Sequence, residues 1–141
     1  AALIALGKLG GREMSYHSDL DLLLIYLGEG RTTGQKMIDY SQFHTELVRR
    51  VIRQLSQLGP GGKLYEIDMR LRPTGKSGTL VVSYEEFHRY YSGGGAQTWE
   101  RLSFTRARPV WGELPGWTKL REHCLWSGPF GDRELSDTRQ M

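Results

Sequence analysis

The sequence contains a single cysteine, Cys124, among its 141 residues. One thiol cannot form an internal disulfide, so the disulfide-stapled scaffolds of small secreted proteins are excluded. No apolar run is long enough to cross a bilayer, and the first residues lack the pattern of a secretion signal. We therefore expect a cytoplasmic protein without a membrane partner.

A large excess of charge of either sign is also missing. The chain has 19 Lys and Arg residues against 16 Asp and Glu, which leaves a net charge of +3. This excess suits an anionic ligand but is too weak to indicate nucleic acid. The sequence also has no stripe of basic and aromatic residues of the kind that binds single strands. We expect no nucleic acid partner.

The chain lacks an initiator methionine and begins with "AALIALG". Its length is that of one domain and suffices for a hydrophobic core. We expect it to be a piece of a longer protein, whose other parts matter for function.

Apolar runs predict two buried strands near the start of the chain. Residues 2–7 form a short run that ends in glycine, and residues 20–27 form a second run rich in Leu and Ile. The second run predicts a central strand covered on both faces. From Met37 to Leu58, apolar residues recur every three or four positions, which predicts a long amphipathic helix.

The next segments predict two more strands and a capped helix. Residues 63–73 alternate between a charged and an apolar face, and residues 79–83 have the composition of a further strand. Ser83 and Glu86 form a capping box, which predicts a helix over residues 84–92.

A further helix is predicted from residue 96 to about Arg108, because Pro109 disfavours the helical conformation in the residue before it. On this helix Arg101, Thr105 and Arg108 lie on one stripe. The arginines could hold acids of the sheet or face solvent, and we favour a structural role for them.

Three carboxylates are candidates for catalysis. Asp19 and Asp21 point to the same side of the second strand, and Asp68 lies on the charged face of a later strand. A lone pair of this kind is usually a solvated strand end, but three acids on adjacent strands would repel one another without cations between them. Oxygen ligands suit Mg²⁺ or Mn²⁺, and two such ions catalyse displacement at phosphorus. The acids therefore predict phosphoryl or nucleotidyl transfer.

A glycine turn, "GKLGG" at residues 7–11, lies between the first strand and the acids. Its backbone N–H groups could approach a triphosphate, and an ordinary tight turn is the alternative.

The glycine turn, the Asp-x-Asp pair on the next strand and the Asp on a later strand together resemble the DNA polymerase β-like nucleotidyltransferase superfamily. The resemblance implies an α/β (α+β) fold with a small mixed sheet flanked by helices. Two registers are open for its glycine motif, one on Gly7 and Lys8 and one on Gly10 and Gly11.

Longer stretches resemble one family within that superfamily. "LGKLGGREMSYHSDLDLLLIY", "LYEIDMRLRPTGKSGTLVVS" and "WERLSFTRARPVWG" look like successive motifs of the bifunctional glutamine synthetase adenylyltransferase and adenylyl-removing enzymes. The resemblance implies transfer of AMP from ATP to a tyrosine of glutamine synthetase, since the sequence is closer to the adenylylating half of these enzymes. Phosphorolytic removal of that AMP, or a fragment that binds nucleotide without turnover, are the alternatives.

The same resemblance assigns the site residues. It implies that Asp19, Asp21 and Asp68 are the catalytic, metal-binding acids for two Mg²⁺ ions. The candidates for contact with ATP are Gly7, Lys8, Gly10, Gly11, Ser18, Arg70 and Arg72. The guanidinium fork of an arginine suits phosphate, although Arg70 and Arg72 could instead pair with Glu66 or neighbouring acids.

The resemblance also implies partners and a division of the chain. Glutamine synthetase is the expected protein substrate, and a nitrogen-signalling regulatory protein is expected to act through regions outside this chain. We expect a nucleotidyltransferase catalytic domain at residues 1–112 and the start of a helical region at residues 113–141.

Overall fold

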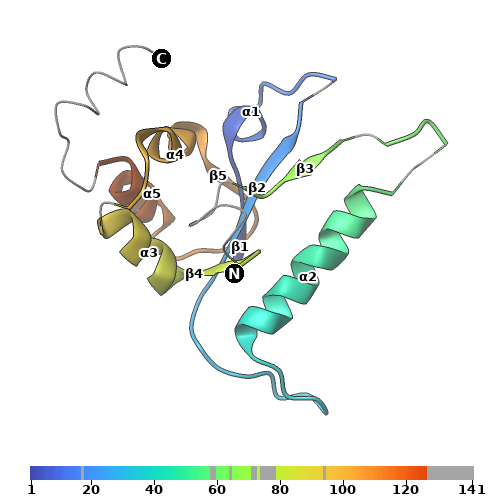
Figure 1. Cartoon of the computed structure of the whole chain (residues 1–141), viewed down its shortest axis with the longest axis vertical. Helices are drawn as coiled ribbons and strands as arrows, with labels where there is room; N and C mark the ends of the chain where they lie inside the picture. The colour runs from blue at the N-terminus through green and yellow to red at the C-terminus, as the bar shows by residue number, and fades with distance from the viewer. Residues whose placement is uncertain are drawn as a thin grey trace.

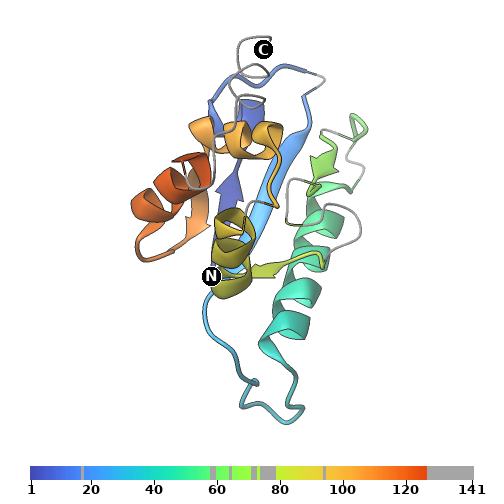
Figure 2. The same ribbon diagram turned by 60° about the vertical axis from the view of Figure 1, so that its left-hand side comes forward.

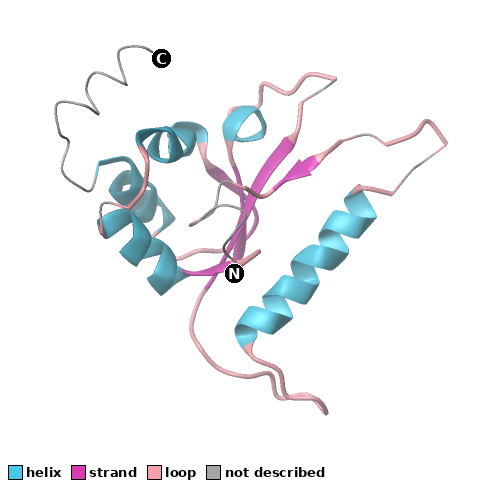
Figure 3. Cartoon of the chain, in the orientation of Figure 1, coloured by secondary structure: helices cyan, strands magenta, loops and turns pink. Residues whose placement is uncertain are grey.

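The computed structural model describes residues 1–16, 18–57, 60–63, 65–70, 73, 79–93 and 95–126. Both strands and helices occur along this part of the chain (Figures 1 and 3). The strands are β1 (Ala2–Ala5), β2 (Leu20–Tyr26), β3 (Ile67–Asp68), β4 (Val82–Ser83) and β5 (Arg108–Gly112). The helices are α1 (Gly7–Gly10), α2 (Tyr40–Leu55), α3 (Tyr84–Ser92), α4 (Thr98–Leu102), the 3₁₀ helix η2 (Ser103–Arg106) and α5 (Trp117–Trp126).

The strands form one mixed sheet in the order β3-β2-β1-β5. Strand β1 is antiparallel to both β2 and β5. Strands β3 and β4 are parallel to β2 and share its free edge, β3 beside the start of β2 and β4 beside its end. This arrangement confirms the predicted α/β chain with a small mixed sheet flanked by helices.

Strand β2 is covered on both faces, as predicted. Leu23 and Ile25 are buried in a core that contains residues of α3, η2 and α5. Leu22 and Leu24 are buried in a second core that contains residues of α2. Figure 2 shows α3, α4 and α5 on one side of the sheet and α2 on the other. An apolar residue at nearly every position of β2 is therefore required by both layers.

The long amphipathic helix is shorter than predicted. It begins at Tyr40, three residues after the expected start at Met37. Ile38 instead accepts a backbone hydrogen bond from Thr32 at 2.9 Å, and Met37 is 59% exposed. The apolar spacing continues into this extended segment and misleads the prediction there. At the other end α2 stops at Leu55, and the predicted last residue, Leu58, lies outside the described residues.

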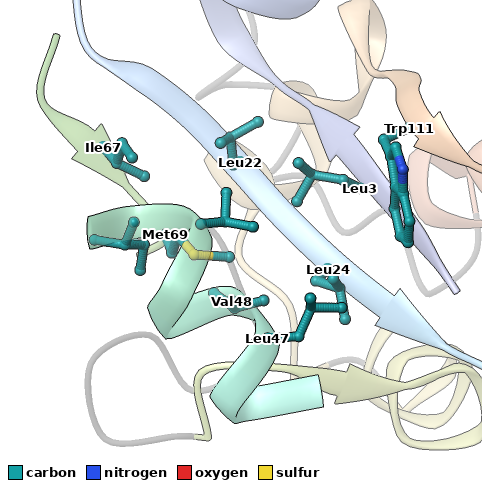
Figure 4. Close-up of a pocket in the computed structure, with 10 residues that line it drawn as sticks. Leu3, Leu22, Leu24, Leu47, Val48, Ile67, Met69 and Trp111 are labelled. Carbon is teal, nitrogen blue, oxygen red and sulfur yellow. The ribbon is translucent and has the colours of Figure 1, made fainter. Parts of the chain in front are cut away.

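Between α2 and the sheet lies an apolar cavity of about 360 Å³, shown in Figure 4. It is lined by Leu3, Leu22, Leu24, Leu47, Val48, Val51, Ile52, Ile67, Met69 and Trp111. Ile67 and Met69 contribute to it while Asp68 between them does not, so the predicted alternation holds at residues 67–69. Tyr65, predicted on the same apolar face, is 38% exposed. The strand itself is only Ile67–Asp68, shorter than the predicted 63–73. A lining without charge does not suit phosphate groups.

The capped helix is confirmed, and the helix after it is partly wrong. Ser83 precedes α3 and its side-chain oxygen accepts a hydrogen bond from the Glu86 amide at 3.2 Å. The helical segment that was expected to reach Arg108 begins at Thr98 and ends at Arg106. Arg108 opens β5, since Pro109 cannot continue a helix but is tolerated in a strand at the edge of a sheet.

Helix α5 packs onto the first core. Leu120 is 2% exposed and Cys124 is fully buried. Burial raises the pKa of the Cys124 thiol to about 12, so the thiol is neutral at pH 7 and unreactive. The expected division of the chain at residue 112 stays a prediction, and residues 127–141 lie outside the described residues. Among the described helices, none has the length and apolar character needed to traverse a lipid bilayer.

Arg101 has the structural role that the sequence favoured. It is 5% exposed, and its guanidinium donates hydrogen bonds to the carbonyl oxygens of Cys124 at 3.0 Å and Tyr91 at 2.9 Å. The guanidinium carbon also lies 5.7 Å from the centre of the Tyr91 ring. Arg101 therefore ties α4 to the ends of α3 and α5.

Two histidines join α3 to α5. The rings of His88 and His123 stack with their centres 4.2 Å apart, and the Ser92 hydroxyl lies 2.7 Å from Nε2 of His123. Burial and, second, the charge of His88 hold the pKa of His123 below its ordinary value of 6.5. Two imidazolium rings cannot stack at this distance without repulsion.

We expect the protein to lose stability as the pH falls below about 6.5, since a depressed histidine pKa means that the unfolded chain binds the proton more readily. His123→Gln should flatten this decline by about 1–2 °C in melting temperature between pH 7.5 and 5.5, a small effect because the ring is partly solvated. Thermal melts at the two pH values measure it. Ser92→Ala removes the hydroxyl contact without removing a titrating group and should keep the full decline. An equal decline in parent and His123→Gln would contradict the expectation.

Candidate active site

Strands β2 and β3 start side by side at one end of the sheet (Figure 1). The three predicted acids belong to these starting segments. Asp19 directly precedes β2, and Asp21 is its second residue. The register of the parallel pair places Asp21 opposite Asp68. The amide of Leu20 donates a hydrogen bond to the carbonyl oxygen of Glu66 at 2.8 Å, which fixes this register. The fold thus brings together carboxylates that are nearly 50 residues apart in the sequence.

The glycine turn lies against one of these acids. The Leu6 amide donates a hydrogen bond to the backbone carbonyl oxygen of Asp21 at 2.9 Å. Gly7 then adopts a φ of +53°, a conformation that side chains disfavour. A Cβ at Gly7 would lie 2.6 Å from a carboxylate oxygen of Asp21. Only glycine therefore leaves space for the Asp21 carboxylate beside the first turn of α1.

The acids repel one another electrostatically. Burial raises the pKa of Asp21, and the negative charges of Asp68 and Asp19 raise it further. Arg70 acts in the opposite direction and lowers it. The cluster therefore has excess negative charge, which a cation would relieve.

Arg70 pairs with Asp68. Its Nε lies 2.9 Å and 2.8 Å from the two oxygens of Asp68, and a terminal nitrogen also contacts Oδ2. The Arg70 amide donates a further hydrogen bond to Asp68 Oδ1 at 2.9 Å. These side-chain hydrogen bonds, and then the charges of Asp68, Asp19 and Asp21, hold the pKa of Arg70 above its ordinary value. Glu66, the other acid considered for Arg70, pairs with Lys63 at 2.6 Å.

Beside the acids is an open cavity of about 390 Å³, which we call the acid cavity. It is lined by Asp19, Ile52, Glu66, Ile67, Asp68, Met69, Arg70 and Leu80. Among the described residues, no three His, Cys, Asp or Glu side chains are arranged as a metal site. The donor set itself fits Mg²⁺, because it consists of hard carboxylate oxygens whose negative charge exceeds that of the Arg70 cation. The fit requires that Asp68 exchange its contacts with Arg70 for a metal ion.

The remaining candidates for nucleotide contact are distributed around α1 and the loop after it. Gly10 is buried, and its amide donates a hydrogen bond to the Leu6 carbonyl oxygen at 2.9 Å. The Gly11 amide donates to the Gly7 carbonyl oxygen at 3.0 Å. Lys8 is exposed on the same turn. Ser18 is 7% exposed, and its hydroxyl oxygen accepts a hydrogen bond from the Ser15 amide at 3.0 Å. Arg72 lies outside the described residues.

Sequence reasoning missed the residue that supports the glycine turn from behind. Arg108 in β5 donates hydrogen bonds to the carbonyl oxygens of Gly10 at 2.9 Å and Leu9 at 3.1 Å. The Leu9 carbonyl oxygen also accepts a hydrogen bond from the Arg12 amide at 3.3 Å, so Arg108 adds to the backbone contacts at the end of α1. The wrong placement of Arg108 on a helix concealed this contact, and Pro109 after it was the available signal for a strand.

Comparison with known protein families shows the family to which the chain belongs. A family model described as glutamate-ammonia ligase adenylyltransferase matches residues 1–122. The chain belongs to the glutamate-ammonia ligase adenylyltransferase family. The match spans every described strand and most of α5, so the acids and the glycine turn lie within the family region. It agrees with the family that the quoted motifs resemble.

Curated relatives of the adenylyltransferase family are much longer than this chain. A protein of Thioalkalivibrio sulfidiphilus is 40% identical over 99% of the chain, which covers 15% of that relative. Proteins of Methylococcus capsulatus and Caulobacter vibrioides are 45% and 42% identical over 97% and 88% of the chain, and it covers 14% and 13% of them. All three are named bifunctional glutamine synthetase adenylyltransferase/adenylyl-removing enzyme. The chain thus spans about one seventh of their length.

Proposed function

We propose that this chain is the catalytic part of an enzyme that transfers AMP from ATP to a tyrosine of glutamine synthetase. The observation that carries the proposal is the alignment of Asp21 with Asp68 on neighbouring strands, with the Gly7 turn directly against Asp21. Acids at this position beside a glycine turn suit a nucleotide triphosphate with its divalent ions. The family match and the names of the relatives supply the substrate. Use of ATP is consistent with the cytoplasm as its proposed location.

The proposal includes the DNA polymerase β-like fold and a metal site. Asp19, Asp21 and Asp68 would hold two Mg²⁺ ions. When bound, such ions lower the pKa of an attacking hydroxyl and stabilise the charge on the leaving oxygen. The chain's own contribution is to hold Asp21 and Asp68 on two paired strands and Asp19 directly before one of them, so that the sheet sets their positions.

For the triphosphate we propose the register on Gly7 and Lys8. The amides of Gly10 and Gly11 already donate hydrogen bonds within α1, whereas the first amides of a helix have no partner inside it. Gly10 and Gly11, which have no side chains, would then allow the turn to pack closely against Arg106 of η2. Ser18 would keep the loop before Asp19 in place through Ser15. Arg70 and Arg72 would bind phosphate oxygens, as guanidinium groups do.

The reaction is an in-line displacement at the α-phosphorus of ATP. The tyrosine oxygen forms a bond to phosphorus, the bond from phosphorus to the β-phosphate oxygen breaks, and pyrophosphate leaves with its electron pair. The hydroxyl proton passes to solvent. The residues of this chain position the phosphates, and the open acid cavity leaves room for a side chain of another protein to approach.

A second candidate is phosphorolytic removal of AMP from modified glutamine synthetase. It is favoured by the names of the relatives, which state both activities. Inorganic phosphate would then attack the phosphorus of the AMP-tyrosine link and release the tyrosine oxygen. A nitrogen-signalling regulatory protein would act through parts of the longer protein in either case.

The test is Mg²⁺-dependent transfer of labelled AMP from ATP to glutamine synthetase, followed by intact mass. Transfer by the parent chain and a loss of at least about 100-fold in Asp19→Asn would support adenylylation. Asp39→Asn removes an exposed acid that pairs with Arg31 outside the acid cluster, and this variant should transfer AMP normally. Release of AMP from modified glutamine synthetase only when phosphate is present would support removal instead. Nucleotide binding without either reaction would overturn both catalytic proposals for the isolated chain.

A further inference from the structure

Arg70 has an unusual position within the acid cluster. Among the described residues that line the acid cavity it is the single cation, beside Asp19, Glu66 and Asp68. Alternation along the extended chain brings Arg70 to the same side as Asp68, two residues earlier. Its guanidinium contacts both carboxylate oxygens of Asp68. Arg70 therefore occupies the oxygens that a metal ion would need.

The two partners differ in exposure. The Arg70 side chain is 61% exposed, whereas the Asp68 side chain is 14% exposed and belongs to a strand paired with β2. An exposed guanidinium can leave its partner and be solvated at little cost, while the carboxylate is fixed by the sheet. The geometry thus makes Arg70 the mobile partner.

We infer that Arg70 is a placeholder cation: it neutralises Asp68 in the metal-free protein, gives way to a divalent cation, and then binds the phosphates of the incoming nucleotide. The inference rests on the proposed function, because it needs a metal-nucleotide substrate. A divalent ion carries twice the charge of a guanidinium and can be shared by several carboxylates, so it displaces Arg70 when it enters. The released fork has the shape to bind phosphate oxygens. Arg70 thereby neutralises Asp68 when no metal is bound and binds phosphate when the metal and nucleotide are bound.

Arg70→Gln should shift two affinities in opposite directions. Mn²⁺ alone should bind the nucleotide-free variant roughly fivefold more tightly than the parent, because the competing charge has gone. ATP in saturating Mn²⁺ should bind the variant at least about fivefold more weakly, because a phosphate contact has gone. Isothermal titration calorimetry measures both affinities on the same protein. A residue with a purely structural role would not produce changes of opposite sign.

The matched control is Lys63→Gln. Lys63 lies on the same segment and carries the same charge, but it pairs with Glu66. This variant should leave both affinities within about twofold of the parent, as expected for an exposed charge. Arg70→Lys keeps the charge without the fork and should lie between the parent and Arg70→Gln in both titrations.

Three other outcomes of these titrations would overturn the inference in whole or in part. Equal Mn²⁺ affinities of the parent and Arg70→Gln would overturn it, and normal AMP transfer by the parent would then show that the proposed function stands without it. Tighter Mn²⁺ binding with unchanged ATP binding would overturn the second role of Arg70. Absence of Mn²⁺ binding by the parent and the variant would overturn both the inference and the metal site on which the proposed function depends.

Discussion

Asp21→Asn is expected to lower AMP transfer strongly and, in the same protein, to make the metal-free fold more stable. Loss of the Asp21 carboxylate removes one of the ligands proposed for the ions, so transfer should fall roughly 100-fold or more. Stability should rise because the pKa of Asp21 is raised by burial and by Asp68 and Asp19. A raised carboxyl pKa favours folding at low pH, and this contribution is lost as the pH rises through the folded-state pKa. At pH 7 the ionised Asp21 therefore opposes folding.

The increase in the free energy of unfolding from Asp21→Asn should be small, and it should be measurable only without metal. The site is partly solvated, so we expect about 0.2–1 kcal/mol, measured by urea unfolding in EDTA at pH 7. Added Mg²⁺ should stabilise the parent and not the variant, since binding to the folded state alone raises its stability. Asp39→Asn changes an exposed acid outside the cluster and should show neither effect. A variant that is less stable than the parent in EDTA would contradict the electrostatic account of the site.

Gly10→Ala is expected to destabilise the protein by about 3 kcal/mol, or roughly 10 °C in melting temperature. A Cβ at this position would lie 2.4 Å from the Arg106 carbonyl oxygen and 2.8 Å from that of Ala5. Both atoms belong to the backbone, so the clash cannot be relieved by a side-chain rotation. Either η2 or α1 must move, and α1 carries the glycine turn that lies against Asp21.

The matched control for Gly10→Ala is Gly34→Ala. Gly34 is exposed, and a Cβ there would have no atom within 4 Å among those described. This substitution should leave the melting temperature within about 2 °C of the parent. Thermal denaturation of the two variants and the parent measures the difference. A loss in Gly10→Ala no larger than that in Gly34→Ala would show that α1 does not pack closely on η2.

The strands that carry the acids could be predicted because their signals are local. The apolar run at β2, the alternation around Asp68 and the cap at Ser83 each depend on neighbouring residues. What could not be predicted depends on pairing across the fold. Strand β5 has weak local character, and its extended form is stabilised by hydrogen bonds to β1. The length of β3 was overestimated because alternation continues beyond the two residues that pair with β2.

The candidate site shows the same division. Residue types and spacing were enough to select Asp19, Asp21 and Asp68, but not to show which partner each side chain takes. The Arg70 contact with Asp68 was one of the open alternatives, and only the fold decides between it and Glu66. The support of α1 by Arg108 requires β5 to lie beside the glycine turn, a proximity that no local pattern contains. Roles of the acids in binding metal and nucleotide stay predictions.

The pairing of β1 on both sides has a consequence for how the protein is made. Ala5 pairs with Leu22 soon after it in the chain, but Ala2 pairs with Gly112, roughly a hundred residues later. During synthesis β1 therefore has one open edge until β5 leaves the ribosome. Contacts between such distant residues slow folding, and an unpaired strand edge promotes association between chains. A chain truncated before β5 should aggregate even though it contains all three acids.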